Sequence, residues 1–139
     1  MNDISLKQAD AVVSGTLEAA RKAGASPIAV VVLDRAGHVV AAKREDGATM
    51  FRFDIALGKA WGCAAFGQTS RALAAKAADN PNFFLSLSTT SSGRLLPNPG
   101  GMPIRDHAGE LIGAVGVSGD SGAQDEVFAI AGIELAGLS

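Results

Sequence analysis

Two short segments with the same turn pattern constrain the fold of this chain more than any other feature. The sequences DRAGHVVAA (residues 34–42) and DHAGELIGA (residues 106–114) share Asp, Ala, Gly and a final Ala at equal offsets. The glycine of each Asp-x-x-Gly turn can adopt the positive φ that a tight hairpin turn requires, and apolar, β-branched runs flank the turns. Shared turn chemistry is the simplest explanation of the likeness, and two antiparallel hairpins are predicted in either case.

Helices are predicted before, between and after the hairpins. Apolar residues three or four positions apart predict a first helix over residues 5–24. An alanine-rich stretch over residues 51–78 predicts two helices separated at residues 67–69, and a last helix is expected over residues 122–138. This order predicts an α+β fold, in which helices pack on an antiparallel sheet, as a single domain over residues 1–139.

Residues 80–101, NPNFFLSLSTTSSGRLLPNPGG, form the irregular part of the sequence. Their proline, glycine and serine content predicts a loop with one short helix at residues 83–87. Loops of this length in small domains usually serve a function or move, so the segment is a candidate ligand region. A solvated loop without a ligand is the alternative.

Glycines recur at every third position in the stretch GAVGVSGDSGAQDE (residues 113–126), as they do in some phosphate-binding loops. Ser121 followed by Gln124 predicts a capped helix start, and Asp125 and Glu126 would occupy the first turn, where carboxylates are favoured. These carboxylates would repel a phosphate, no lysine follows the glycines, and the preceding hairpin is not a βαβ unit. The glycines therefore indicate a strand that a neighbouring element or a ligand approaches closely.

The composition argues against several classes of function. The 139 residues carry a formal net charge of −2 without a basic run, and aromatic residues are only 5%, so no nucleic-acid partner is expected. The one cysteine, Cys63, can form no intramolecular disulfide and no metal cluster, and no metal site is predicted. The sequence shows no signal-peptide pattern and no 18-residue apolar span, so a cytoplasmic location without a membrane partner is expected.

A combined pattern over nearly the whole chain resembles the GlcG/HbpS-like family of small haem-binding or haem-degrading proteins, to which the C-terminal domain of PduO-type proteins is related. The matching segments are GGMPI (residues 100–104), IGAVGVSG (112–119), QDE (124–126), the first hairpin and DIALGKAWGCAAF (54–66). The resemblance implies a profilin-like three-layer α/β/α sandwich with a five-stranded antiparallel sheet. It also implies homo-oligomers, built from dimers that assemble into larger rings or octamers.

Haem, the cofactor that the resemblance implies, needs an axial ligand and an apolar slot. The candidate ligands are His38 and His107 in predicted turns, Met50, Met102 and Cys63. A turn histidine is commonly solvated, Cys63 is expected to be a small core residue, and Met50 is expected to pack near a pocket wall. Some family members bind haem through a histidine in the first helix, and this sequence has none there.

Polar residues of the irregular segment are candidate ligand contacts, because the resemblance places this region close to the ligand pocket. Thr89, Thr90 and Arg94 lie in the segment, and the guanidinium of Arg94 suits a haem propionate or another carboxylate. Gly100 and Gly101 belong to the family motif and are assigned to the same pocket.

Lys59 is the charged residue most in need of an explanation. It lies among apolar residues on a helix expected to pack on the sheet, so it requires an ionic partner or a lowered pKa. Asp46, Asp54 and Glu45 are the candidate partners in a structural ion pair, and a ligand contact is the alternative role. Arg44 and Asp46 match an Arg-x-Asp-Gly-Ala stretch of the family and are expected to line the same pocket.

Three hypotheses of function follow from the residues and the resemblance. The first is a small-ligand-binding protein that binds haem, with any breakdown of haem driven by the cofactor and an oxidant. The second is a cofactor-independent enzyme or accessory protein of small-molecule catabolism that acts on a carboxylate or an aldehyde, with Lys59 as its catalytic acid or base. The third is a non-catalytic module of oligomeric assembly.

Overall fold

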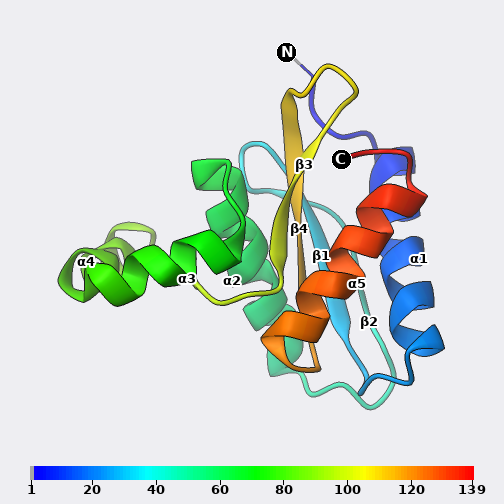
Figure 1. The fold of residues 1–139 in the computed structure, drawn as a ribbon, viewed down its shortest axis with the longest axis horizontal. Coiled ribbons are helices and arrows are strands. Elements are labelled where there is room, and N and C mark those ends of the chain that lie inside the picture. The colour runs from blue at the N-terminus through cyan, green and yellow to red at the C-terminus, as the bar shows by residue number, and fades with distance from the viewer. Residues whose placement is uncertain (1) are drawn as a thin grey trace.

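The computed structural model describes residues 2–139 of the chain (Figure 1). The elements in chain order are α1 (Leu6–Lys22), β1 (Ala29–Asp34), β2 (Val39–Arg44), α2 (Phe51–Phe66), α3 (Ser70–Asp79), α4 (Pro81–Thr90), β3 (Gly101–Arg105), β4 (Leu111–Ser118) and α5 (Gly122–Leu135). The predicted α+β class, the two hairpins and the order of helices and strands are confirmed.

The sheet is antiparallel with the strand order β2-β1-β4-β3. Within residues 2–139 the sheet has four strands, so the prediction of a fifth strand is wrong. At the outer edge of β3, the backbone N–H and C=O of Arg105 instead pair with those of Ser139. A single residue of the C-terminal segment therefore lies where a further strand would pair.

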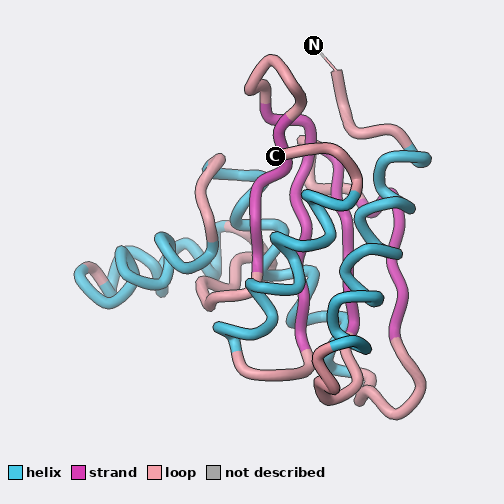
Figure 2. The backbone as a smooth tube through the Cα atoms, turned by 45° about the vertical axis from the view of Figure 1, so that its right-hand side comes forward, coloured by secondary structure: helices cyan, strands magenta, loops and turns pink. Residues whose placement is uncertain are grey.

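The sheet is the middle of three layers. Helices α1 and α5 pack together on one face, and α2 packs on the other (Figure 2). The side chains of β1 alternate between these faces: Val30 and Val32 join the core under α1 and α5, and Val31 joins the core under α2. The layered arrangement that the resemblance implied is thus present.

Both hairpin turns are built as their sequences predict. The carboxylate of Asp34 accepts hydrogen bonds from the backbone N–H groups of Ala36 and His38, and Asp106 does the same for Ala108 and Glu110. The glycines of the two turns have φ of 85° and 80°, the left-handed region that glycine adopts without strain. Equal turn chemistry thus accounts for the likeness of the two segments.

Helices α3 and α4 project from the three-layered body as an arm, at the left of Figure 1. The break between α2 and α3 is confirmed: Gly67 ends α2 with a φ of 65°, and the side chain of Thr69 caps α3. The short helix expected at residues 83–87 is the longer α4, which starts with Pro81. None of the ten described residues of α4 is buried.

Candidate functional site

The segment after α4 is bound to the body along one side of α2. Two glycines of α2, one turn apart, make room for two leucines: a Cβ at Gly58 would lie 2.8 Å from Leu96 Cβ, and one at Gly62 would lie 2.8 Å from Leu95 Cδ1. The backbone N–H of Leu96 also donates to the carbonyl of Gly58. The segment is therefore ordered by close packing against α2, and Arg94 stands at its start.

Arg94 and Trp61 form the most distinctive polar–aromatic contact of the structure. The guanidinium carbon of Arg94 lies 4.7 Å from the centroid of the Trp61 ring, a distance typical of a cation–π contact. The Nε1 edge of the indole packs on the first hairpin turn, where a Cβ at Gly37 would lie 2.8 Å from Trp61 Nε1. Trp61 thus contacts both a hairpin turn and a cation.

A pocket of about 150 Å³ opens beside this pair, where α2, α4 and the following turn meet. Its walls are mostly apolar and comprise Trp61, Ala65, Phe66, Leu87, Thr90, Ser91, Arg94 and Leu95. We call it the Trp61–Arg94 pocket. Of the predicted site residues, the fold brings Thr90 and Arg94 together here.

The guanidinium of Arg94 is oriented from its own turn. Its Nε donates a 2.7 Å hydrogen bond to the carbonyl of Ser91, and the Ser91 hydroxyl accepts one from the backbone N–H of Leu95. Within residues 2–139, the two terminal amino groups of Arg94 have no hydrogen-bonding partner in the protein. They are the groups that bind a carboxylate with two parallel hydrogen bonds.

Lys59 is buried on the sheet-facing side of α2, with 3% of its side chain exposed. Its Nζ donates to the carbonyl of Val117 at 2.8 Å and to Asp125 Oδ2 at 3.2 Å. The other carboxylate oxygen of Asp125 accepts from the backbone N–H of Asp120. The ion pair therefore joins α2, the end of β4 and the first turn of α5.

Burial is the largest influence on the pKa values of Lys59 and Asp125. It lowers the pKa of Lys59 and raises the pKa of Asp125, in each case against the opposing effect of the partner's charge. The prediction was an ionic partner or a lowered pKa, and Lys59 has an ionic partner. The predicted partners Asp46, Asp54 and Glu45 are wrong, because Asp125 pairs with Lys59 and is more than a helix-capping charge.

Gly100 and Gly101 lie beside Lys59 rather than in the Trp61–Arg94 pocket. A Cβ at Gly100 would lie 2.7 Å from Lys59 Nζ, and one at Gly101 would lie 2.7 Å from the carbonyl oxygen of Lys59. Since Lys59 itself lines no part of that pocket, the structure separates these three residues from Arg94.

Arg44 and Asp46 lie elsewhere, in an open groove of about 440 Å³ that also includes residues of α1. In that groove the Nε of Arg21 pairs with Glu45 Oε2 at 2.8 Å. The expectation that Arg44 and Asp46 line the same pocket as Lys59 and Arg94 is therefore wrong. Arg44 is the last residue of β2 and Asp46 lies two residues after it, whereas Arg94 precedes the segment that packs against α2.

The other predicted ligand residues lie outside the Trp61–Arg94 pocket. His38 and His107 are exposed in the two hairpin turns, Met50 is 80% exposed at the start of α2, and Thr89 is exposed and does not line the pocket. Cys63 is fully buried, and burial raises the pKa of its thiol to about 12. No group of three or more His, Cys, Asp or Glu within residues 2–139 is arranged to hold a metal ion.

Two important residues were missed by the sequence analysis. Asp125 was explained by its helix-start position, and only the fold reveals that Lys59 reaches it over a sequence separation of 66 residues. Trp61 received no site prediction, because it lies within the alanine-rich stretch that predicts a helix. Its status as the chain's one tryptophan, in a helix otherwise rich in alanine and glycine, was the available signal.

Comparison with known proteins identifies relatives over nearly the full chain. A family model described as "Haem degrading protein HbpS-like" matches residues 4–134. An uncharacterised 15.0 kDa protein of Citrobacter freundii, from the dhaT–dhaS intergenic region, is 30% identical over 103 residues, which are 74% of this chain and 71% of that protein.

Solved structures share the fold. A double mutant of HbpS from Streptomyces reticuli superposes with a TM-score of 0.84 at 29% identity, covering 97% of this chain and 88% of that one. Klebsiella pneumoniae protein ORFY has a TM-score of 0.88 at 26% identity, covering 99% and 92%. A PduOC:heme complex has a TM-score of 0.86 over 99% and 97% of the two chains, and at 23% identity it supports the fold alone.

None of the helices within residues 2–139 is both long and apolar enough to cross a membrane.

Proposed function

Because this chain belongs to the HbpS-like family, we propose that it binds a small ligand that carries a carboxylate, and that haem is the first ligand to test. The observation that carries the proposal is the Trp61–Arg94 pocket. There a guanidinium with two unpaired amino groups lies on an indole ring, beside an apolar hollow. Such a pocket would orient a ligand by its carboxylate and retain it by burial of its apolar part.

The residues of the pocket fit a propionate and the edge of haem, but they do not fit its iron. Arg94 would pair with a propionate, and Trp61 and Leu87 would contact the edge of the macrocycle. The lining holds no His, Cys, Met or Tyr, the side chains that usually bind haem iron. The family description supports haem, whereas iron coordination from this pocket has no support in its side chains.

Titration with hemin, followed by the Soret absorbance, tests the haem assignment. We expect a saturable shift in the wild-type protein and an affinity at least ten-fold lower in Arg94→Ala, because a hydrogen-bonded ion pair to a carboxylate is lost. Arg71→Ala is the matched control, since Arg71 is an exposed arginine paired with Glu126 and lies outside the pocket. An unsaturable shift, or equal affinities of the three proteins, would contradict haem binding at this pocket.

We further propose that Lys59 stabilises the fold and takes no part in catalysis. It is closed off from solvent, it is bonded to Val117 and Asp125, and Gly100 lies against its amino group. A substrate would have to displace part of the core to reach it. The enzyme hypothesis therefore lacks a catalytic group at the pocket.

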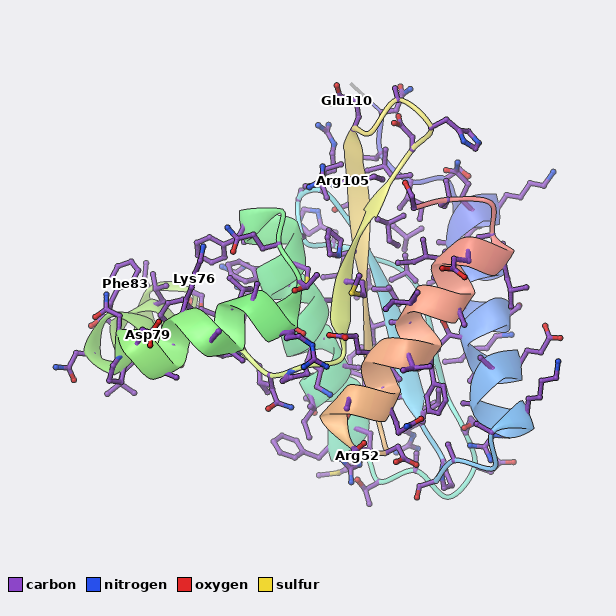
Figure 3. The ribbon with its side chains drawn as sticks, in the orientation of Figure 1. Arg52, Lys76, Asp79, Phe83, Arg105 and Glu110 are labelled. Atoms are coloured by element: carbon purple, nitrogen blue, oxygen red, sulfur yellow. The ribbon has the colours of Figure 1, made fainter. Side chains whose placement is uncertain are left out.

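We also propose that the chain forms homo-oligomers through its arm. Helix α4 carries no charged residue, and Phe83 and Leu85 on it are 52% and 72% exposed; Phe83 is labelled on the arm in Figure 3. Burial of such side chains against a second copy would stabilise an assembly. Native mass spectrometry of Leu85→Glu should show fewer assembled subunits than the wild type, whereas Asp79→Ala, on the same arm, should leave the assembly intact. Monomeric wild-type protein would refute this proposal.

A further inference from the structure

We infer that the Trp61–Arg94 pocket accommodates a monocarboxylate whose apolar part is a single ring, and that Leu87 sets the upper size of that ring. The inference rests on the proposed function, because it uses the same pocket, and it names the class of ligand. It comes from three properties of the pocket: its volume, the free end of Arg94 and the wall that α4 provides.

The volume fits one ring. The pocket measures about 150 Å³. An apolar protein cavity of about that size binds benzene. A tetrapyrrole is several such rings across, so only its propionate edge would enter this pocket. A benzoate-sized ligand would instead fit within the hollow, in contact with Trp61, Leu87 and Leu95.

The free end of Arg94 selects an anion with a planar pair of oxygens. Because Nε is already bonded to Ser91, a carboxylate would approach the two terminal amino groups end-on. No carboxylate side chain lines the pocket to neutralise the guanidinium from within. Arg94 is also held on the indole at 4.7 Å, so little rotamer freedom is lost when the anion binds.

Leu87 is the wall that limits the ring. It is the large aliphatic residue that α4 contributes to the pocket, and it is half-buried, whereas Leu85 on the same helix is 72% exposed and lies outside the pocket. The wall that Leu95 provides is fixed, because Leu95 packs against Gly62 on α2. Shortening Leu87 therefore enlarges the pocket on its arm side.

Tryptophan fluorescence reports binding directly, since Trp61 is the chain's one tryptophan. Benzoate is the probe, benzamide is its uncharged counterpart, and calorimetry supplies the affinity. We expect a saturable change with benzoate, with at least ten-fold weaker binding of benzamide and at least ten-fold weaker binding of benzoate to Arg94→Ala. Arg71→Ala should bind benzoate as the wild type does. Equal binding of benzoate and benzamide, or no saturable change with benzoate, would overturn the inference.

The size limit is tested with 2-naphthoate, which adds a second ring to the same carboxylate. The wild-type protein should prefer benzoate, and Leu87→Ala should shift the preference toward naphthoate by about ten-fold. Leu6→Ala, which removes an equal volume from an exposed leucine of α1, outside both the pocket and the arm, should leave the preference unchanged. The size limit is wrong if both leucine variants behave alike, provided that their circular dichroism spectra match that of the wild type.

Benzoate and hemin together separate this inference from the proposed function. Binding of benzoate without hemin would support a single-ring ligand and refute haem. Binding of hemin without benzoate, with Arg94 required, would support the proposed function and refute the single-ring ligand. Failure of both would refute the pocket as a carboxylate site.

Discussion

The two faces of the sheet are packed in different ways. Under α1 and α5, large aliphatic and aromatic side chains such as Ile112, Val115 and Phe128 fill the space between helix and sheet. Under α2 the residues are mostly small, and the backbones approach directly: a Cβ at Gly116 would lie 1.9 Å from the carbonyl oxygen of Ala56.

This difference explains where the polar groups of the interior lie. A helix held at backbone distance brings Lys59 within reach of the Val117 carbonyl and of Asp125. The same helix presents Gly58 and Gly62 to the segment that carries Arg94. The face under α1 and α5 supplies hydrophobic stability, and the face under α2 supplies the precise geometry on which the Trp61–Arg94 pocket depends.

The largest effect is expected from Gly116→Ala. The added methyl group would collide with the backbone of α2, which cannot rotate away, so we expect a loss of about 3 kcal/mol or more in the free energy of unfolding. Urea denaturation measures it. Gly109→Ala is the control: a Cβ there meets nothing within 4 Å, and only its φ of 80° costs about 1 kcal/mol. Equal losses at the two positions would contradict close packing of α2.

A similar loss is expected when the buried ion pair is broken on one side. Asp125→Ala leaves the ammonium of Lys59 buried without its carboxylate, which costs about 3–5 kcal/mol in the free energy of unfolding. The double variant Lys59→Met, Asp125→Leu removes both charges and should recover most of that loss. If the double variant loses as much free energy of unfolding as Lys59→Met and Asp125→Ala together, the pair does not act as a coupled unit.

On the opposite face a smaller, graded response is expected. Ile133→Val removes one buried methylene group beneath α5 and should cost about 1 kcal/mol, measured by the same denaturation. The loss reflects cavity formation and not a collision or a stranded charge. A loss as large as that of Gly116→Ala would mean that the two faces are equally intolerant of change.

The smallest effect is a dependence on pH. Because burial lowers the pKa of Lys59, the unfolded chain binds this proton up to a higher pH than the folded chain does. Between the lowered pKa and the ordinary value of 10.5, the stability of the wild type should therefore rise with pH relative to Lys59→Met. Thermal melting between pH 8 and 10.5 measures the difference. A relative stability that falls over this range would contradict burial as the dominant cause.

Local chemistry made the architecture predictable from sequence, and long-range contacts limited the prediction of the site. The turn aspartates and Gly67 act on residues within four positions of themselves, so the hairpins and the helix break could be located. The ion pair of Lys59 and Asp125 depends on how α2 and α5 meet across the sheet, which no local pattern encodes.

The candidate site was predicted in part for the same reason. Arg94 was identified by its chemistry in an irregular segment, but its position over Trp61 depends on the packing of that segment against α2. Arg44 and Asp46 were grouped with it through the family motif, although they line a different groove. The fifth strand came from the resemblance alone, and the pairing of Ser139 with Arg105 takes its place.

The indole resonance of Trp61 tests the central claim most directly, because a ¹⁵N-labelled sample of this chain gives one such signal. Benzoate is added to the wild type, to Arg94→Ala and to Arg71→Ala, and the shift of that signal is followed to saturation. A saturable shift in the wild type and Arg71→Ala, strongly weakened in Arg94→Ala, is the result predicted for a carboxylate pocket formed by Trp61 and Arg94. An unmoved signal, or the same shift in all three proteins, would contradict it.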